Sequence, residues 1–159
     1  MKTLKNSTLF YLFVLLISVQ FATAQKLVTA AEVTPALLKE TCDNAYIEII
    51  EVKDTYIKIK NTYNVYLDID SSKRFVTFSS VYNLVEGASK KDALELVNKL
   101  NAEVALIKTY YSESTNTITY FYYFWTEGGF TQKSLISSLR LYKTALDLTL
   151  EKDTGKLIK

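Results

Sequence analysis

Residues 63–82, YNVYLDI-DSSK-RFVTFSSVY, decide the fold class of this chain. In the first seven residues, Val65 and Leu67 alternate with polar or aromatic neighbours, which is typical of a half-buried strand. Residues 74–82 show a second strand pattern, and only the polar segment Asp70–Lys73 separates the two. So short a connection joins antiparallel neighbours, since parallel strands need a long crossover. The stretch therefore predicts an antiparallel hairpin.

Toward the N-terminus, strand patterns continue up to one helix. Residues 46–52 (YIEIIEV) are rich in strand-forming side chains, and residues 55–60 (TYIKIK) alternate with a period of two. Residues 53–54 (KD) between them are a turn signal. Before the strands, the hydroxyl of Thr34 can cap a helix. Pro35 suits the first helical position, because the N–H that proline lacks has no acceptor there. A helix is predicted over residues 34–44.

Toward the C-terminus, the pattern changes from strand to helix and back. Ser89 and Asp92 have the spacing of a capping box, and apolar residues at helical spacing follow. This predicts a helix that stops near Asn101. The remaining predicted elements are strands over residues 104–111 and 117–126, around a polar loop, and a long helix capped by Thr131 that ends near Glu151.

Together these elements predict an α+β fold. An antiparallel β-sheet of five to six hairpin-linked strands packs with three α-helices in the order α-β-β-β-α-β-β-α. The elements occupy residues 34–151, which is the length of one ordinary domain. Residues 25–33 are interpreted as an N-terminal lead, and residues 152–159 as a frayed basic tail.

The first 24 residues have the three parts of a secretory signal peptide. Lys2 and Lys5 form a basic region, residues 9–19 (LFYLFVLLISV) form an apolar run, and residues 22–24 (ATA) form a small-residue cleavage site. The alternative, a membrane anchor, needs about 20 apolar residues. We therefore expect cleavage after Ala24, a periplasmic or secreted protein, and no membrane span in the mature chain.

The charge balance bears on the class of partner. Removal of the signal lowers the number of Lys and Arg from 19 to 17, which equals the 17 Asp and Glu. A nucleic-acid-binding domain would show a basic excess, so no nucleic-acid partner is predicted.

Cys42 is the only cysteine and has no disulfide partner within the chain. We expect its thiol to be buried as a small apolar group.

Motifs for catalysis and metal binding are missing from the sequence. The chain has no histidine, which removes the usual base of Ser and Cys nucleophiles and the commonest transition-metal ligand. Residues 68–72 (DIDSS) begin like a calcium loop, but Lys73 and Ser79 stand where glycine and glutamate are needed. We predict no catalytic residues, metal site or cofactor. Two acidic pairs are interpreted as solubilising: Glu48 with Glu51, and Glu113 with Glu127.

The aromatic strand YFYYFW, residues 120–125, is the best candidate for a functional site. Successive residues of a strand point to opposite faces, so Phe121, Tyr123 and Trp125 share one face. A four-residue loop at 112–115 would pair Lys108 with Thr119 on that same face. Because an unpaired lysine is rarely buried, this should be the less covered face. The opposite face is then predicted to be core: Ile107, Ile118, Tyr120, Tyr122 and Phe124.

Three adjacent aromatic residues on a weakly covered face indicate a binding surface. Phe121, Tyr123 and Trp125 are therefore the predicted partner-binding residues. The partner is a protein or peptide, or a second copy of the chain. Two alternatives stay open: helices cover both faces of the strand, or sheet and helices line a pocket for a small apolar ligand.

The second half of the chain carries a family resemblance. Residues 93–101 (ALELVNKLN) are followed by a strand, a polar loop, a second strand, residues 128–131 (GGFT) and a long helix. This arrangement, with the elements before it, resembles the YbjN domain family from about Thr34 to Glu151. The resemblance implies a fold like that of type III secretion chaperones. It also implies a non-enzymatic binding or regulatory domain, with no catalytic residues.

Overall fold

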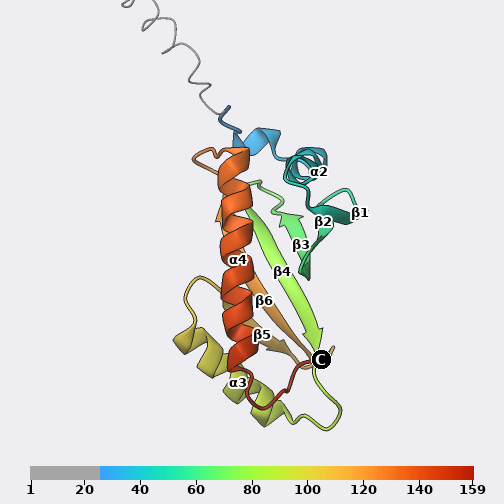
Figure 1. The fold of residues 1–159 in the computed structure, drawn as a ribbon, viewed down its shortest axis with the longest axis vertical. Coiled ribbons are helices and arrows are strands. Elements are labelled where there is room, and N and C mark those ends of the chain that lie inside the picture. The colour runs from blue at the N-terminus through green and yellow to red at the C-terminus, as the bar shows by residue number, and fades with distance from the viewer. Residues whose placement is uncertain (1–25) are drawn as a thin grey trace, which may run out of the picture.

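A computed structural model describes residues 26–159 of the chain, so the predicted signal peptide at residues 1–24 lies outside the described residues. One antiparallel sheet and three α-helices make up the fold (Figure 1). A short 3-10 helix, η1 (Ala30–Glu32), precedes them. The bounds are α2 (Pro35–Asn44), β1 (Glu48–Val52), β2 (Tyr56–Asn61), β3 (Tyr63–Ile69), β4 (Phe75–Asn83), α3 (Lys90–Glu103), β5 (Lys108–Ser112), β6 (Thr117–Trp125) and α4 (Gln132–Lys152).

The predicted α+β class is confirmed, with the higher of the two expected strand numbers. The six strands lie in the order β1-β2-β3-β4-β6-β5, and every neighbouring pair is antiparallel. Four strands, rather than the three of the predicted order, precede α3. The chain then leaves the sheet through α3, returns to form β5 at the edge, and places β6 beside β4.

Side-chain caps begin all three helices at the predicted residues. The Thr34 hydroxyl accepts a hydrogen bond from the Leu37 amide at 3.2 Å. The Ser89 hydroxyl accepts one from the Asp92 amide at 3.1 Å. These caps satisfy amides that have no partner within the helix, which is why each helix starts where it does. Thr131 caps α4 in the same way through the Ser134 amide at 3.1 Å.

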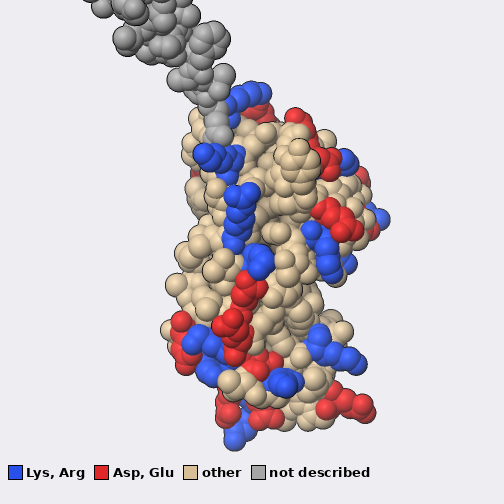
Figure 2. Space-filling model, in the orientation of Figure 1, with Lys and Arg blue, Asp and Glu red and all other residues tan. Residues whose placement is uncertain are grey.

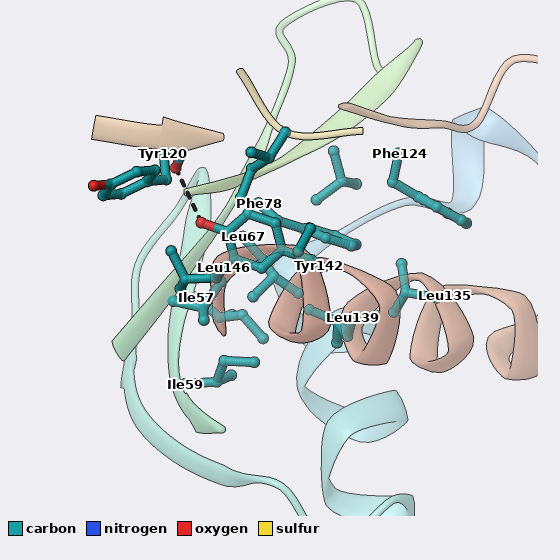
Figure 3. Packing of buried hydrophobic residues seen from close by; sticks show 14 of the residues in the cluster. Ile57, Ile59, Leu67, Phe78, Tyr120, Phe124, Leu135, Leu139, Tyr142 and Leu146 are labelled. Carbon is teal, nitrogen blue, oxygen red and sulfur yellow. Dashed lines mark hydrogen bonds between the residues drawn. The ribbon is translucent and has the colours of Figure 1, made fainter. Parts of the chain in front are cut away.

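The core lies between one face of the sheet and the helices. In Figure 1, α4 runs along the sheet across β4 and β6. Its buried Tyr142 donates a hydrogen bond from its hydroxyl to the Tyr120 carbonyl of β6 at 3.0 Å (Figure 3). Phe78 of β4 packs edge-on against the same tyrosine, with ring centroids 6.1 Å apart. The predicted core side of β6 is confirmed: Ile118, Tyr120 and Phe124 are buried, and Tyr122 packs against them.

Both described ends of the chain are attached to the fold. In the N-terminal lead, Val28 forms an isolated bridge with Phe130. In the C-terminal tail, the buried Asp153 carboxylate accepts hydrogen bonds from the amides of Leu157 and Ile158, both at 3.0 Å. Ile158 then bridges to Leu84. The prediction of a frayed tail was therefore wrong, because Asp153 anchors it to the end of β4.

Strand β5 starts four residues later than predicted. The chain bends at residues 105–106, and Leu106 takes the left-handed conformation at φ 70°. The cause is Asn101 of α3: its side-chain amide donates to the Thr109 carbonyl, and its oxygen accepts from the Thr109 amide, both at 2.8 Å. Asn101 thus replaces a neighbouring strand at this point of the sheet edge.

Asn101→Ala is expected to lower the free energy of unfolding by about 1–3 kcal/mol, because it leaves two backbone groups of Thr109 without partners. Urea denaturation followed by circular dichroism measures the change. Asn98→Ala, on the exposed side of the same helix, is the matched control and should change stability by less than about 0.5 kcal/mol. Equal effects of the two variants would contradict a role for Asn101 at the edge.

Candidate functional site

The sheet face opposite the core is the candidate site, and we call it the outer face. Phe121 is partly exposed, and Tyr123 and Trp125 are 50% and 57% exposed. All three lie on the outer face, because they alternate along β6 with the core residues. Their predicted position on the less covered side is therefore confirmed, and helices of the described chain do not cover both faces. Partner binding by these residues stays a prediction.

The predicted register between β5 and β6 was wrong by two residues. Lys108 pairs with Phe121 rather than with Thr119, and Ser112 pairs with Thr117. The loop is residues 113–116, where Asn116 adopts a φ of 51° that closes the hairpin. Because side chains alternate with a period of two, a shift of two residues leaves every side chain on its predicted face.

The aromatic side chains of the outer face form a continuous ladder across three strands. Phe75 of β4 lies between Trp125, stacked at 6.3 Å, and Tyr123, edge-on at 5.0 Å between ring centroids. The ladder continues from Tyr123 to Phe121 at 5.3 Å, and from Phe121 to Tyr110 of β5 at 5.8 Å. We call these five residues the aromatic ladder. Phe75 was missed in the sequence analysis, because the pairing of β4 with β6 was not predicted. Tyr110 was also missed, although it lies two residues after Lys108 and so on the same strand face.

Small side chains line β4 beside the ladder. Thr77 pairs with Tyr123, and Ser79 pairs with Phe121. The outer face therefore has a ridge of large rings along β6 and a furrow of small hydroxyl side chains along β4. Val81 at the end of this furrow is 51% exposed.

Two charged residues of opposite sign flank the ladder. Lys108 lies on β5, one strand beyond Phe121. Asp68 lies on β3, opposite Thr77, and partial burial raises the pKa of its carboxyl above the usual value. Within residues 26–159, neither the Asp68 carboxylate nor the Lys108 ammonium has an ion-pair partner. A carboxylate on this face is thus partly desolvated without a compensating cation.

Cys42 is buried, and one member of each acidic pair forms an ion pair on the surface. Cys42 is fully buried, as predicted, and burial raises its pKa to about 12, so the thiol stays protonated and unreactive at neutral pH. Glu51 forms an ion pair with Lys53 at 3.0 Å, and Glu113 forms one with Lys90 at 2.6 Å. In the part of the chain that the structure describes, His, Cys, Asp and Glu form no group of three with metal-binding spacing.

The helix side carries charge and shallow grooves. Figure 2 shows basic side chains over one half of α4 and acidic ones over the other. A groove of about 390 Å³ lies between the lead, α2 and the start of α4, where Lys26, Glu32, Glu40 and Lys133 contribute to its lining. Its charged lining does not suit the apolar ligand of the carrier alternative. Across residues 26–159, the helices are too short or too polar to cross a membrane.

A comparison with protein families identifies the domain. The profile of YbjN, described as "Putative bacterial sensory transduction regulator", matches residues 34–151. The chain belongs to the YbjN family. The match runs from α2 to the end of α4, so the whole outer face lies within the YbjN domain, while η1 and the C-terminal tail flank it.

A solved structure shows the same YbjN fold. It is described as "Crystal structure of YbjN, a putative transcription regulator from E. coli", and it matches with a TM-score of 0.66 at 14% sequence identity. The alignment covers 78% of this chain and 94% of that chain. The resemblance read from the sequence is thereby confirmed. A search of curated proteins found no relative with significant similarity.

Proposed function

We propose that this YbjN-family chain is an exported, non-catalytic domain that binds a protein or peptide through its outer face. The observation that carries the proposal is the uncovered aromatic ladder. Tyr123 and Trp125 project from a rigid six-stranded sheet, and the described helices pack on the other side. Exposed apolar patches of this kind mark interaction surfaces, and Tyr and Trp dominate binding energy there.

The chemistry of the face supports a macromolecular partner over a reaction. Its polar groups include the hydroxyls of β4, the flanking Lys108 and Asp68, Lys58 over the ring of Tyr66, and tyrosines. The chain has no histidine to act as a base near neutral pH. The equal numbers of acidic and basic residues expected after cleavage favour a protein over a nucleic acid. The regulatory description of the family fits a domain that acts by binding.

Export is supported by the sequence of the first 24 residues, which has a basic start, an apolar run and a small-residue cleavage site. The protein purified from the envelope or medium of an expressing bacterium is expected to begin at Gln25. Intact-mass spectrometry measures this directly. A mass that retains residues 1–24 in the exported fraction would contradict the proposed processing.

The binding proposal is tested by capture. The mature chain, residues 25–159, is immobilised and exposed to an envelope extract of its own bacterium, in parallel with Tyr123→Ala. The matched control is Leu148→Ala, which removes a 45% exposed side chain from α4 on the opposite side. A protein retained by the wild type and the control but lost from Tyr123→Ala supports the outer face as the binding surface. Equal retention by all three chains would contradict it.

A further inference from the structure

The outer face is complementary in shape to itself. On the outer side of β6, Phe121 and Tyr123 are large rings, whereas their direct partners on β4 are the small Ser79 and Thr77. A twofold axis parallel to the strands, midway between β4 and β6, would lay the β6 of one protomer over the β4 of its partner. Tyr123 would then face Thr77 of the second copy, and Phe121 would face Ser79. At the end of the row, Trp125 would meet Phe75, the residue it already stacks on within its own chain.

The same axis makes the charges complementary. It lays β5 of one protomer over β3 of the other, because these strands lie next to β6 and β4 in the sheet order. Lys108 and Tyr66 are in one row across the sheet, so Lys108 would sit above Tyr66 of the second copy. Because the Lys58 ammonium already lies 5.0 Å from the centroid of the Tyr66 ring, Lys108 would extend away from it along the strand. Asp68 is the next residue on that strand face, about 7 Å further along, within reach of a lysine side chain. The partly desolvated carboxylate would gain its missing cation, and symmetry would make the contact twice.

We propose, on the basis of the binding function assigned above to the outer face, that its occupant is a second copy of this chain. The two sheets pack face to face about a twofold axis parallel to β4 and β6. The aromatic ladder of each copy fills the Thr77–Ser79 furrow of the other, and Lys108 pairs with Asp68 across the interface. The dimer is a β-sandwich with the helices on its two outer sides.

The size of the face suits a stable dimer. The strands β3, β4, β6 and β5 have 7, 9, 9 and 5 residues, and at about 3.3 Å per residue and about 4.8 Å between strands they give a projected area of roughly 480 Å². Specific interfaces bury about 800 Å² of accessible surface on each partner, and a corrugated face has more accessible surface than projected area. Sheets that pack face to face align within about 30° of each other, which keeps the central rows in contact.

Charge reversal tests the proposal by sedimentation equilibrium of residues 25–159. The wild type is expected to dimerise, and K108E and D68K are each expected to weaken the dimer at least about tenfold, since each places like charges in contact twice. An equimolar mixture of the two variants should restore the affinity, because opposite charges then meet at both contacts. The control pair K133E and E40K carries the same charge changes on the helix side, and neither these variants nor their mixture should alter the affinity.

Thermal melting shows whether each variant folds. If D68K does not fold, T77R replaces it, because arginine fills the furrow where the partner's Tyr123 would lie, and this variant should be monomeric. A wild type that stays monomeric at its highest soluble concentration overturns the dimer. Variants that leave the affinity unchanged also overturn it. A monomer that still captures another protein through Tyr123 overturns self-association alone and leaves the proposed binding function standing.

Discussion

Leu139→Ala is expected to lower the free energy of unfolding by about 2–5 kcal/mol, which is the range for a buried leucine replaced by alanine. Leu139 is 1% exposed and lies on the apolar side of α4, between Leu135 and Tyr142 (Figure 3). The long α4 runs across β4 and β6, so a cavity at its middle weakens the contact between helix and sheet. The loss combines the transfer free energy of the missing methyl groups with the cost of the cavity.

Urea denaturation, followed at the fluorescence of the single Trp125 and by circular dichroism, measures this loss. Leu141→Ala is the control, because Leu141 lies on the same helix and is 44% exposed. Its replacement should change stability by no more than about 0.5 kcal/mol. If both variants lose the same amount, the buried side of α4 has been assigned to the wrong residues.

Tyr123→Ala and Trp125→Ala are expected to weaken association much more than folding. Aromatic residues at the centre of an interface typically contribute 2 kcal/mol or more, which corresponds to a loss of affinity of about thirtyfold. In the free protein, both side chains are about half exposed and contact mainly Phe75 and Phe121. Removing either should therefore cost about 1 kcal/mol or less of folding stability.

The comparison needs two measurements on each variant: the midpoint of thermal unfolding, and the dissociation constant of the complex or dimer. Val81→Ala is a control at the end of the same face, outside the aromatic ladder, and it should lose less affinity. Variants that unfold easily but still bind with wild-type affinity would show that the ladder serves the fold and not a partner.

Much of the fold could be predicted because its signals are local. The Thr34 and Ser89 hydroxyls cap helices whose apolar spacing is visible within a few residues. The short polar segment Asp70–Lys73 forms the β3–β4 turn, in which the Lys73 amide donates to the Asp70 carbonyl at 2.7 Å. The alternation along residues 117–125 also placed Phe121, Tyr123 and Trp125 on one face, and a register error of two residues did not change that result.

Other features depend on residues that are far apart in the chain. The aromatic ladder needs Phe75 beside Trp125, and that contact exists only because β6 returns through α3 and β5 to pair with β4. The start of β5 was predicted too early, because residues 104–107 have a strand-like composition. Two hydrogen bonds between the Asn101 side chain and the Thr109 backbone decide where pairing begins. The tail looked frayed because a basic segment gives no sign that Asp153 will bind its amides.

The sequence by itself determined the α+β class, the YbjN family, the helix starts and the face on which the three aromatic residues lie. These follow from capping chemistry and from periodicity, which act over a few residues. Only the tertiary structure decided that this face is open, that its rings continue across three strands, and that Lys108 and Asp68 flank them without ion-pair partners in the described chain. Strand order and burial come from contacts between distant segments, which the local pattern of a strand does not encode.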